Sequence, residues 1–328
     1  MHVVKIELEN FRGVGKLEME FDPHVTVLIG KNGAGKTTII EGTHALLYQA
    51  VLKIIRNPAP YIFQAIEIKN GLDFAKLAIE IQANDTNTRN RWSIELKRGL
   101  DGRPFVSNNS VWLENLGNSG SLEYQIARAQ FPLIAYYSVS RSSFGVSLSP
   151  QTEDSVNRAM MYESQGQANF RLFFEWYRVQ EDLENETRLS SPDKIDYRDP
   201  QLEAVRRAFL QIMPSFTDLR VRRNPLRLEL KKGNEVLLID QLSLGEKSLL
   251  AMIGDLARYL AIRNPNWPNP LEGNGIILID ERSTCTCTHI GSATSSGTFV
   301  RFPKLSVHCF PPIRHRLSGR WTLNAFAS

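Results

Sequence analysis

The stretch with the most definite chemistry is a glycine-rich loop between an apolar segment and a helical pattern. Residues 30–37 read G-K-N-G-A-G-K-T, preceded by the apolar run 25–29 and followed by apolar periodicity to about Ile55. This order predicts a strand, a phosphate-binding P-loop and a helix. Glycines let backbone N–H groups wrap a phosphate chain, and the helix N-terminus adds a favourable partial positive charge. The alternative is a glycine-rich turn that holds no ligand.

The positions of this loop have predicted roles toward a nucleoside triphosphate and its Mg²⁺. Lys36 would reach the β- and γ-phosphates, and the hydroxyl of Thr37 would hold the metal ion. The residues predicted to bind the nucleotide are Asn32, Gly33, Ala34, Gly35, Lys36, Thr37 and Thr38. Arg12, in an earlier turn, is a further candidate. It could equally be a solvated turn residue, because spacing alone does not separate the two interpretations.

Two carboxylates follow an apolar run late in the chain. Residues 275–279 read G-I-I-L-I, and Asp280 and Glu281 come directly after them. We expect Asp280 to bind Mg²⁺ through water and Glu281 to act catalytically by polarising the attacking water. The alternative is a buried strand that happens to end in two surface acids.

A third motif, L-S-L-G-E at residues 242–246, precedes an apolar-periodic helix at 249–262. One interpretation is a plain helix cap, in which Ser243 caps the helix and Glu246 completes a capping box. The other follows from its place between the P-loop and the acidic strand. It then resembles the signature motif of ABC-type ATPases, which implies that Ser243, Gly245 and Glu246 would contact a nucleotide held by a second subunit.

The remaining patterns predict the elements that position these motifs. Alternation predicts strands at 3–9 and through Leu17 to Phe21, and period-two segments suggest an antiparallel layer. Those segments are Phe74–Ile81, Trp92–Leu96 and Val111–Leu113, and further strands are expected at 131–137, 217–222, 226–231 and 235–239. Helices are predicted at Phe170–Glu186, with an aromatic cluster assigned to the core rather than to base stacking, and at Gln201–Met213. These helices form an insert at about 154–214.

Taken in order, the motifs resemble the ABC-type ATPase heads of the SMC/RecF-like AAA group. The residues that carry the resemblance are Asn10-Phe11-Arg12, the P-loop, the 242–246 motif and Ile279-Asp280-Glu281. Stand-alone bacterial ATPases of retron and Septu anti-phage systems are the most similar members. The resemblance covers residues 1–281. It implies an α/β P-loop NTPase fold with an ABC/SMC-head-like mixed sheet, a flanking antiparallel layer and a short helical insert.

The same resemblance implies how the protein works. ATP and Mg²⁺ would be the cofactors, and two heads would form a homodimer closed over ATP. The family suggests DNA repair or anti-phage defence with a separate nuclease or other effector, with DNA as a candidate ligand. Two departures stand out: a long coiled-coil arm is missing, and Gln130 is only a weak candidate for the Q-loop glutamine.

Residues 282–328 do not continue this pattern, since they lack periodicity and contain no acidic residue. The family would continue with a D-loop and later a switch histidine. A shifted reading frame over 282–292 permits I-D-L-H-L-H-P-H-W-Q-R, and over 311–315 it permits T-H-S-P; both look like the family's continuation. We therefore interpret 282–328 as a non-homologous, frameshifted and poorly ordered tail. The alternative is a genuine short tail, in which Cys285, Cys287 and His289 could suggest zinc, although one Cys-x-Cys is a weak signal.

The formal net charge of +4 conceals an uneven distribution. The tail holds six Lys/Arg and all three cysteines, which leaves residues 1–281 with 33 basic and 35 acidic residues. The net charge is therefore poor support for a DNA-binding surface. No apolar run reaches the ~20 residues of a membrane span, and the N-terminus lacks the layout of a signal peptide. These features favour the cytoplasm and no membrane partner.

Two other functions remain open. The first is the ATP-binding subunit of an ABC transporter. It is disfavoured by Glu246, where transporters usually carry glutamine, by the Asn10-Phe11-Arg12 start and by the aromatic insert. The second is a catalytically impaired, truncated nucleotide-binding protein, which ATP binding without turnover would favour.

Overall fold

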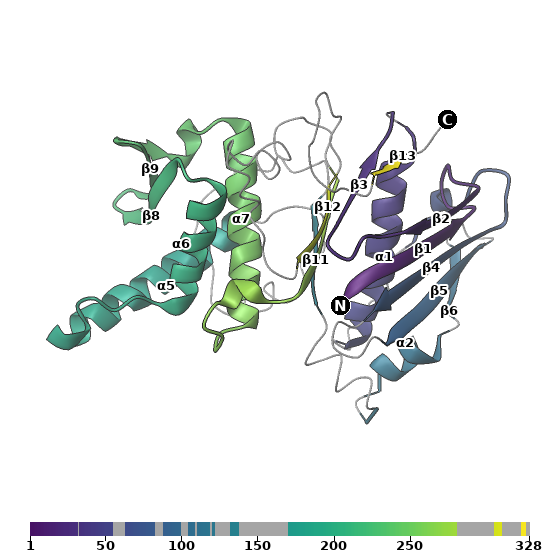
Figure 1. Ribbon diagram of the computed structural model, residues 1–328, viewed down its shortest axis with the longest axis horizontal. Coiled ribbons are helices and arrows are strands. Elements are labelled where there is room, and N and C mark those ends of the chain that lie inside the picture. Colours follow the sequence, from purple (N-terminus) through teal and green to yellow (C-terminus); the bar gives the residue numbers. More distant parts are fainter. Residues whose placement is uncertain are drawn as a thin grey trace. The chain divides into compact units, whose positions relative to one another are not determined.

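The structure is a computed structural model (Figure 1). It describes residues 1–31, 33–54, 63–82, 88–99, 104–108, 110–118, 120–121, 132–137, 170–280, 305–309 and 323–325. These residues fall into two compact units. Unit 1 holds the described residues up to Tyr136 together with 274–280, 305–309 and 323–325, and unit 2 holds Tyr137 and 170–273.

Unit 1 contains a five-stranded antiparallel sheet with the order β2-β1-β4-β5-β6. Its strands are β1 (His2–Glu9), β2 (Lys16–Glu20), β4 (Phe74–Gln82), β5 (Arg89–Arg98) and β6 (Pro104–Asn108). The register places Ile6 opposite both Met19 and Ile79, and Ile79 opposite Trp92. Because residues directly opposite one another on neighbouring strands point to the same side of the sheet, these four residues share one face, which is buried. The predicted flanking antiparallel layer is present.

The P-loop helix α1 (Lys36–Ile54) packs on the buried face of this sheet. Trp92 Nε1 donates a hydrogen bond of 3.2 Å to the carbonyl of Leu46 in the helix. A Cβ at Gly42 would lie 3.1 Å from Leu8 Cδ2, so the glycine permits the close approach of helix and sheet. The apolar contact between helix and sheet therefore fixes where the N-terminus of α1 lies.

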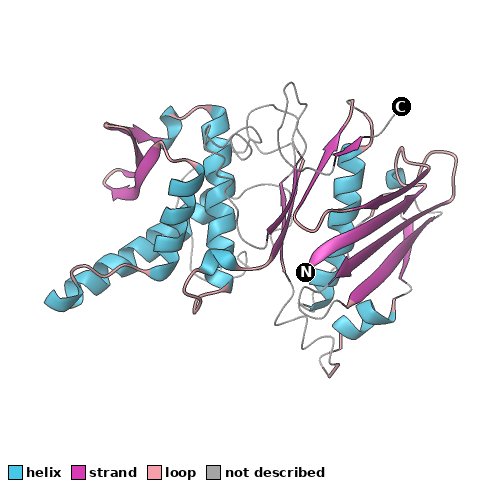
Figure 2. Cartoon of the chain, viewed as in Figure 1, coloured by secondary structure: helices cyan, strands magenta, loops and turns pink. Residues whose placement is uncertain are grey.

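The second sheet has the order β13-β3-β12-β11-β7. Figure 2 shows the strands in magenta and the helices in cyan. Its strands are β3 (Val25–Ile29), β7 (Leu133–Tyr137), β11 (Gly275–Ile279), β12 (Leu305–Cys309) and β13 (Leu323–Ala325). β12 pairs in parallel with both β11 and β3, and β13 pairs in parallel with β3. The carboxyl ends of β3 and β11 therefore lie at the same edge of the sheet. β11 is buried along its whole length, as its continuous apolar run predicted.

Strands β12 and β13 belong to the segment for which poor order was expected. The structure gives both a place in the parallel sheet, with β12 between β3 and β11. All other residues of 282–328 lie outside the described part of the chain. The origin of the segment in a shifted reading frame stays a hypothesis.

The prediction of a strand at Val111–Leu113 is wrong. The structure has a short helix, α2 (Val111–Leu116), whose N-cap Ser110 accepts a hydrogen bond of 3.3 Å from the N–H of Leu113. Leu113 and Leu116 are buried three residues apart, which is a helical repeat. Three alternating residues were too short a pattern to outweigh the serine cap.

Unit 2 is built on three helices, α5 (Phe170–Ser190), α6 (Pro200–Ile212) and α7 (Leu244–Arg263). Figure 1 shows α5 and α6 as consecutive helices joined through a short turn, and Asp199 caps α6 by accepting from the N–H groups of Gln201 and Leu202. The aromatic cluster of α5 is buried, which confirms its assignment to the core; its members are Phe173, Phe174, Trp176 and Tyr177. The described part of the insert contains no long coiled-coil arm.

A small antiparallel sheet, ordered β10-β9-β8, precedes α7 in the chain. Its strands are β8 (Phe216–Arg223), β9 (Leu226–Lys232) and β10 (Glu235–Leu238), close to the predicted bounds. Among the described residues, no helix is long and apolar enough to cross a membrane.

Candidate nucleotide site

The P-loop connects β3 to α1 as predicted, and two of its glycines require the left-handed backbone region. Gly33 has φ +85° and Gly35 has φ +88°, conformations that side chains rarely adopt. Gly33 and Ala34 are exposed, so this part of the loop is accessible to a ligand. Asn32 lies outside the described residues.

Lys36 folds back over the start of its own loop. Its Nζ donates to the carbonyl of Gly30 at 2.7 Å and to that of Lys31 at 2.9 Å. These two bonds hold the ammonium group against the start of its own loop, and both acceptors are neutral carbonyls. A phosphate oxygen is a stronger acceptor for an ammonium than a neutral carbonyl is. The position suits the phosphate contact predicted for Lys36.

Thr37 and Asp280, which are 243 residues apart in sequence, meet at the edge of the parallel sheet. The Thr37 hydroxyl donates to Asp280 Oδ1 at 3.3 Å. Asp280 is 5% exposed at the end of β11. A hydroxyl and a carboxylate oxygen in contact are ligands that suit Mg²⁺. The two residues predicted to hold the metal are thus brought together, while Glu281 lies outside the described residues.

Phosphate and water would complete a metal shell around these two donors. Among the described residues, no group of three or more His, Cys, Asp or Glu is placed to hold a metal ion. Mg²⁺ commonly takes only one or two protein ligands and completes its octahedron with substrate phosphates and waters. The donors present therefore fit a nucleotide-bound Mg²⁺.

Arg12 lies in a turn whose backbone is unusual. Asn10 and Arg12 have φ of 54° and 53°, a region that non-glycine residues seldom occupy. Hydrogen bonds from the N–H of Arg12 to the Glu67 carbonyl (2.7 Å) and from the N–H of Lys69 to the Asn10 carbonyl (2.8 Å) hold the turn. The turn adjoins the P-loop, because a Cβ at Gly35 would lie 3.6 Å from Val14 Cγ2.

The guanidinium of Arg12 forms ion pairs with two carboxylates, Glu41 of α1 and Glu67 (Nη2 to Oε1, 2.8 Å). Burial opposes the charge, but the hydrogen bond with Glu67 and the pairing with Glu41 raise the pKa of Arg12. These carboxylates use only part of the five N–H donors of an arginine. A contact between Arg12 and the nucleotide stays a prediction.

Sequence reasoning gave no role in the site to Glu41, His44 or Tyr136. Glu41 also accepts a hydrogen bond of 3.2 Å from the hydroxyl of Tyr136, and the ring of Tyr136 stacks on His44 with centroids 4.6 Å apart. Burial lowers the pKa of His44 to about 4, so its imidazole is neutral near pH 7. Glu41 follows Thr37 by four residues, which places both on one helix face. This spacing of four residues was the sequence signal that could have placed Glu41 near the site.

The signature residues begin α7 in unit 2 and form the capping box that was one of the two interpretations. Ser243 Oγ accepts from the N–H of Glu246 at 3.3 Å, and Glu246 Oε2 accepts from the N–H of Ser243 at 2.9 Å. A hydrogen bond from Lys232 and those from Ser243 lower the pKa of Glu246. Ser243 and Leu244 are exposed, and Gly245 is half-buried. The cap does not exclude the signature role, because an exposed helix N-terminus can still receive an anion.

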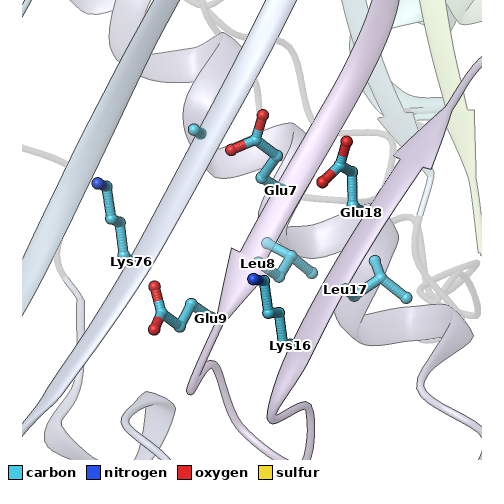
Figure 3. Close-up of a pocket in the computed structure, with 8 residues that line it drawn as sticks. Glu7, Leu8, Glu9, Lys16, Leu17, Glu18 and Lys76 are labelled. Atoms are coloured by element: carbon cyan, nitrogen blue, oxygen red, sulfur yellow. The ribbon is translucent and has the colours of Figure 1, made fainter.

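Figure 3 shows a pocket that is separate from these motifs. It lies on β1, β2 and β4 and contains no P-loop residue; its lining is Glu7, Leu8, Glu9, Lys16, Leu17, Glu18, Lys76 and Ala78. Lys5 pairs with Glu7 at 3.1 Å and also with Glu18. Exposed charges of both signs on an antiparallel sheet are ordinary surface chemistry. We assign no function to this pocket.

The strand, glycine loop and helix at 25–54, with Asp280 beside Thr37, define a P-loop NTPase fold. The chain belongs to the AAA domain family, whose family model matches residues 5–231.

Two curated relatives are similar over most of the chain. The retron Ec83 probable ATPase of Escherichia coli is 28% identical over 346 residues, covering 86% of this chain and 63% of that protein. The retron Vc95 probable ATPase of Vibrio cholerae is 27% identical over 337 residues, covering 84% and 63%. The chain therefore spans less than two thirds of the length of these relatives. Among solved structures, an Smc head bound to the C-winged helix domain of ScpA has a TM-score of 0.49 at 16% identity, covering 94% of this chain and 90% of that one.

Proposed function

We propose that this chain binds ATP with Mg²⁺ at the P-loop and hydrolyses it. The observation that carries the proposal is the contact between Thr37 and Asp280, which joins the end of the P-loop to the end of β11. A plain glycine turn would not need a buried acid from a distant strand at its last residue. Membership of the AAA domain family and the names of the two retron relatives support the same activity.

Each residue has a defined task in this proposal. Backbone N–H groups of residues 33–38 cradle the phosphates, and Lys36 exchanges its carbonyl partners for the β- and γ-phosphates. Thr37 and Asp280 hold Mg²⁺, which neutralises charge on the phosphates when it is bound. Glu281 orients and polarises the attacking water. Arg12 offers its remaining N–H groups to the phosphate chain from the adjoining turn.

We further propose that two copies close over the nucleotide. The exposed Ser243 and Leu244 at the start of α7 leave this helix N-terminus accessible to a second copy. Ser243 and Gly245 would then present a hydroxyl and N–H groups to the partner's γ-phosphate. The resemblance of the motifs to those of stand-alone ATPases from retron and Septu anti-phage systems favours a role in anti-phage defence with a separate nuclease or effector, and DNA repair is the related alternative.

The test of ATP binding uses the purified full chain and a fluorescent ATP analogue, with phosphate release measured in parallel. Lys36→Ala should weaken binding roughly 10- to 100-fold, because hydrogen bonds to charged groups contribute ~1.5–3 kcal/mol. Lys31→Ala is the matched control, since it removes an exposed lysine from the same loop. Asp280→Asn should keep binding measured in EDTA and lose Mg²⁺-dependent turnover by about 100-fold or more. Equal binding by wild type and Lys36→Ala would refute the site.

The test of closure is the oligomeric state by sedimentation with a non-hydrolysable ATP analogue. Wild type should dimerise only when the analogue is present. Ser243→Arg should stay monomeric while it binds the analogue normally, because the long cation blocks the exposed N-cap. Dimers that form equally in Ser243→Arg would exclude the signature contact.

Nucleotide binding without turnover is a second candidate, favoured by the change in composition after Glu281. Binding that depends on Lys36, with no phosphate release in wild type, would support it. Resequencing the coding DNA across codons 278–320 tests the cause. A changed base that restores the family's continuation would require the assays to be repeated on the corrected chain.

A charged sheet face in unit 2 favours DNA as a further ligand. Arg220, Arg222 and Arg227 all pair with the buried Glu229, at 3.3, 3.0 and 2.8 Å. Arg220 also pairs with Asp218 at 3.9 Å, so three guanidinium groups face two carboxylates and leave an excess of positive charge, which suits a phosphate backbone. DNA affinity should fall with salt, and the double variant Arg222→Ala/Arg227→Ala should reduce the slope by about two phosphate contacts. An unchanged slope would exclude this face.

A further inference from the structure

Tyr136 and Tyr137 are neighbours in β7 and engage two different helices. The chain passes from unit 1 to unit 2 between them, so that Tyr136 belongs to unit 1 and Tyr137 to unit 2. Consecutive residues of a strand point to opposite faces. We propose that this tyrosine pair couples nucleotide at the P-loop to the signature helix α7 of the same chain. The inference rests on the proposed function.

The unit 1 half of the link is tied to the P-loop helix. The Tyr136 hydroxyl donates to Glu41 Oε1 at 3.2 Å, and its ring stacks on His44 with 29° between the planes. Glu41 lies one helical turn after Thr37 and also pairs with Arg12. A shift of the first turns of α1, or a movement of Arg12 toward a phosphate, would therefore change the position or pairing of Glu41, which accepts from the Tyr136 hydroxyl.

The unit 2 half is tied to the middle of α7. The Tyr137 hydroxyl donates to Asp255 Oδ2 at 3.3 Å, and Asp255 Oδ1 accepts from Arg258 Nη2 at 2.8 Å. Burial and the neighbouring Asp255 raise the pKa of Tyr137 well above its ordinary value, so the phenol remains a donor. α7 begins with the signature residues, so a movement of Tyr137 acts on the helix that carries them.

The buried contacts among Tyr137, Asp255 and Arg258 carry a desolvation cost that a purely structural contact would not need. Arg258 is 0% exposed and Asp255 is 3% exposed. Burying such a pair is expensive unless every donor is satisfied. Among the described residues, Arg258 Nε and Nη1 have no hydrogen-bond partner. Apolar residues of similar size would stabilise this core at least as well, which argues that the charges serve to fix Tyr137 and α7 to one another.

Hydrogen exchange tests the coupling on the full chain. With an ATP analogue bound, amides of residues 250–258 should exchange about fivefold or more slowly in wild type, the lower end of typical couplings between sites. Tyr136→Phe and Tyr137→Phe should bind the analogue as wild type does, while this response falls below about twofold. The double variant should equal either single variant, because both hydroxyls act in one link. Measurement at two protein concentrations tenfold apart removes any contribution from a second copy.

Tyr177→Phe is the matched control. Tyr177 is also buried in unit 2, and its hydroxyl donates to the Leu219 carbonyl at 2.9 Å outside the proposed link. It should lose stability like the other variants and keep the full exchange response. A response that survives in both Tyr136→Phe and Tyr137→Phe would overturn the coupling. Failure of wild type to bind the analogue would instead refute the proposed function.

Discussion

His44 provides a quantitative test of how the P-loop helix is packed. The imidazole lies in α1, 5% exposed, between the rings of Tyr48 and Tyr136. Burial lowers its pKa from 6.5 to about 4. Between these pH values the unfolded chain binds a proton that the folded chain does not. Stability contributed by neutral His44 is therefore present above pH 6.5 and is lost as the pH falls toward 4.

The magnitude follows from the size of the shift. One pKa unit corresponds to 1.36 kcal/mol, so the full shift amounts to about 3 kcal/mol at pH 4 and about 2 kcal/mol at pH 5. His44→Phe keeps an aromatic ring between the tyrosines and cannot be protonated. On going from pH 7 to pH 5, wild type should therefore lose about 2 kcal/mol more than His44→Phe does.

Urea unfolding followed by tryptophan fluorescence measures this difference. Trp92 reports on the same region, because it is buried and bonds to the Leu46 carbonyl two residues beyond His44. His24→Phe is the control, since it replaces an exposed histidine outside α1. The imidazole proton signal that disappears in His44→Phe should stay in its neutral position down to pH 5. A titration of that signal near pH 6.5, or parallel pH dependence of wild type and His44→Phe, would refute the buried packing of α1.

Two further predictions concern the packing of α7. Gly254→Ala would normally stabilise a helix, but its Cβ would lie 2.8 to 2.9 Å from the ring of Phe173. We expect a loss of about 1–3 kcal/mol in urea unfolding, and stabilisation would show that α5 and α7 do not pack this closely. Asp255→Asn should cost roughly 3–5 kcal/mol by leaving the Arg258 charge unpaired, whereas Asp255→Leu with Arg258→Met and Tyr137→Phe, which also removes the hydroxyl that donates to Asp255, should be neutral or stabilising. Calorimetry of each protein measures the loss in the free energy of unfolding. Equal losses in both variants would contradict a buried ion pair.

The P-loop could be predicted because the residues that define it are adjacent in the sequence. Left-handed glycines, a lysine and a hydroxyl at fixed offsets leave one backbone path around a phosphate, and the structure follows it at Gly33 and Gly35. The strand and helix on either side were equally visible, since their apolar patterns are continuous. The failure at Val111–Leu113 came from a pattern only three residues long, where one cap decided the outcome.

The contact between Thr37 and Asp280 could be expected for a different reason. Neither residue by itself identifies the other as its partner. Thr37 follows the loop after β3 and Asp280 follows β11, so both lie at the carboxyl edge of the parallel sheet. β3 and β11 are both in that sheet and parallel to β12. Parallel strands gather their ends, so sequence patterns that identify two such strands also predict that their terminal residues meet.

The tyrosine pair could not be predicted in this way. Glu41 and Tyr136 are 95 residues apart, and Tyr137 and Asp255 are 118 apart. No spacing rule connects a strand residue to a particular helix carboxylate, because the partner depends on how layers stack. The predicted strand at 131–137 implies only that adjacent tyrosines face opposite ways. The two hydroxyls contact helices that carry different motifs, Tyr136 through Glu41 of α1 and Tyr137 through Asp255 of α7. Substitution of a single hydroxyl group should therefore break one half of the proposed link.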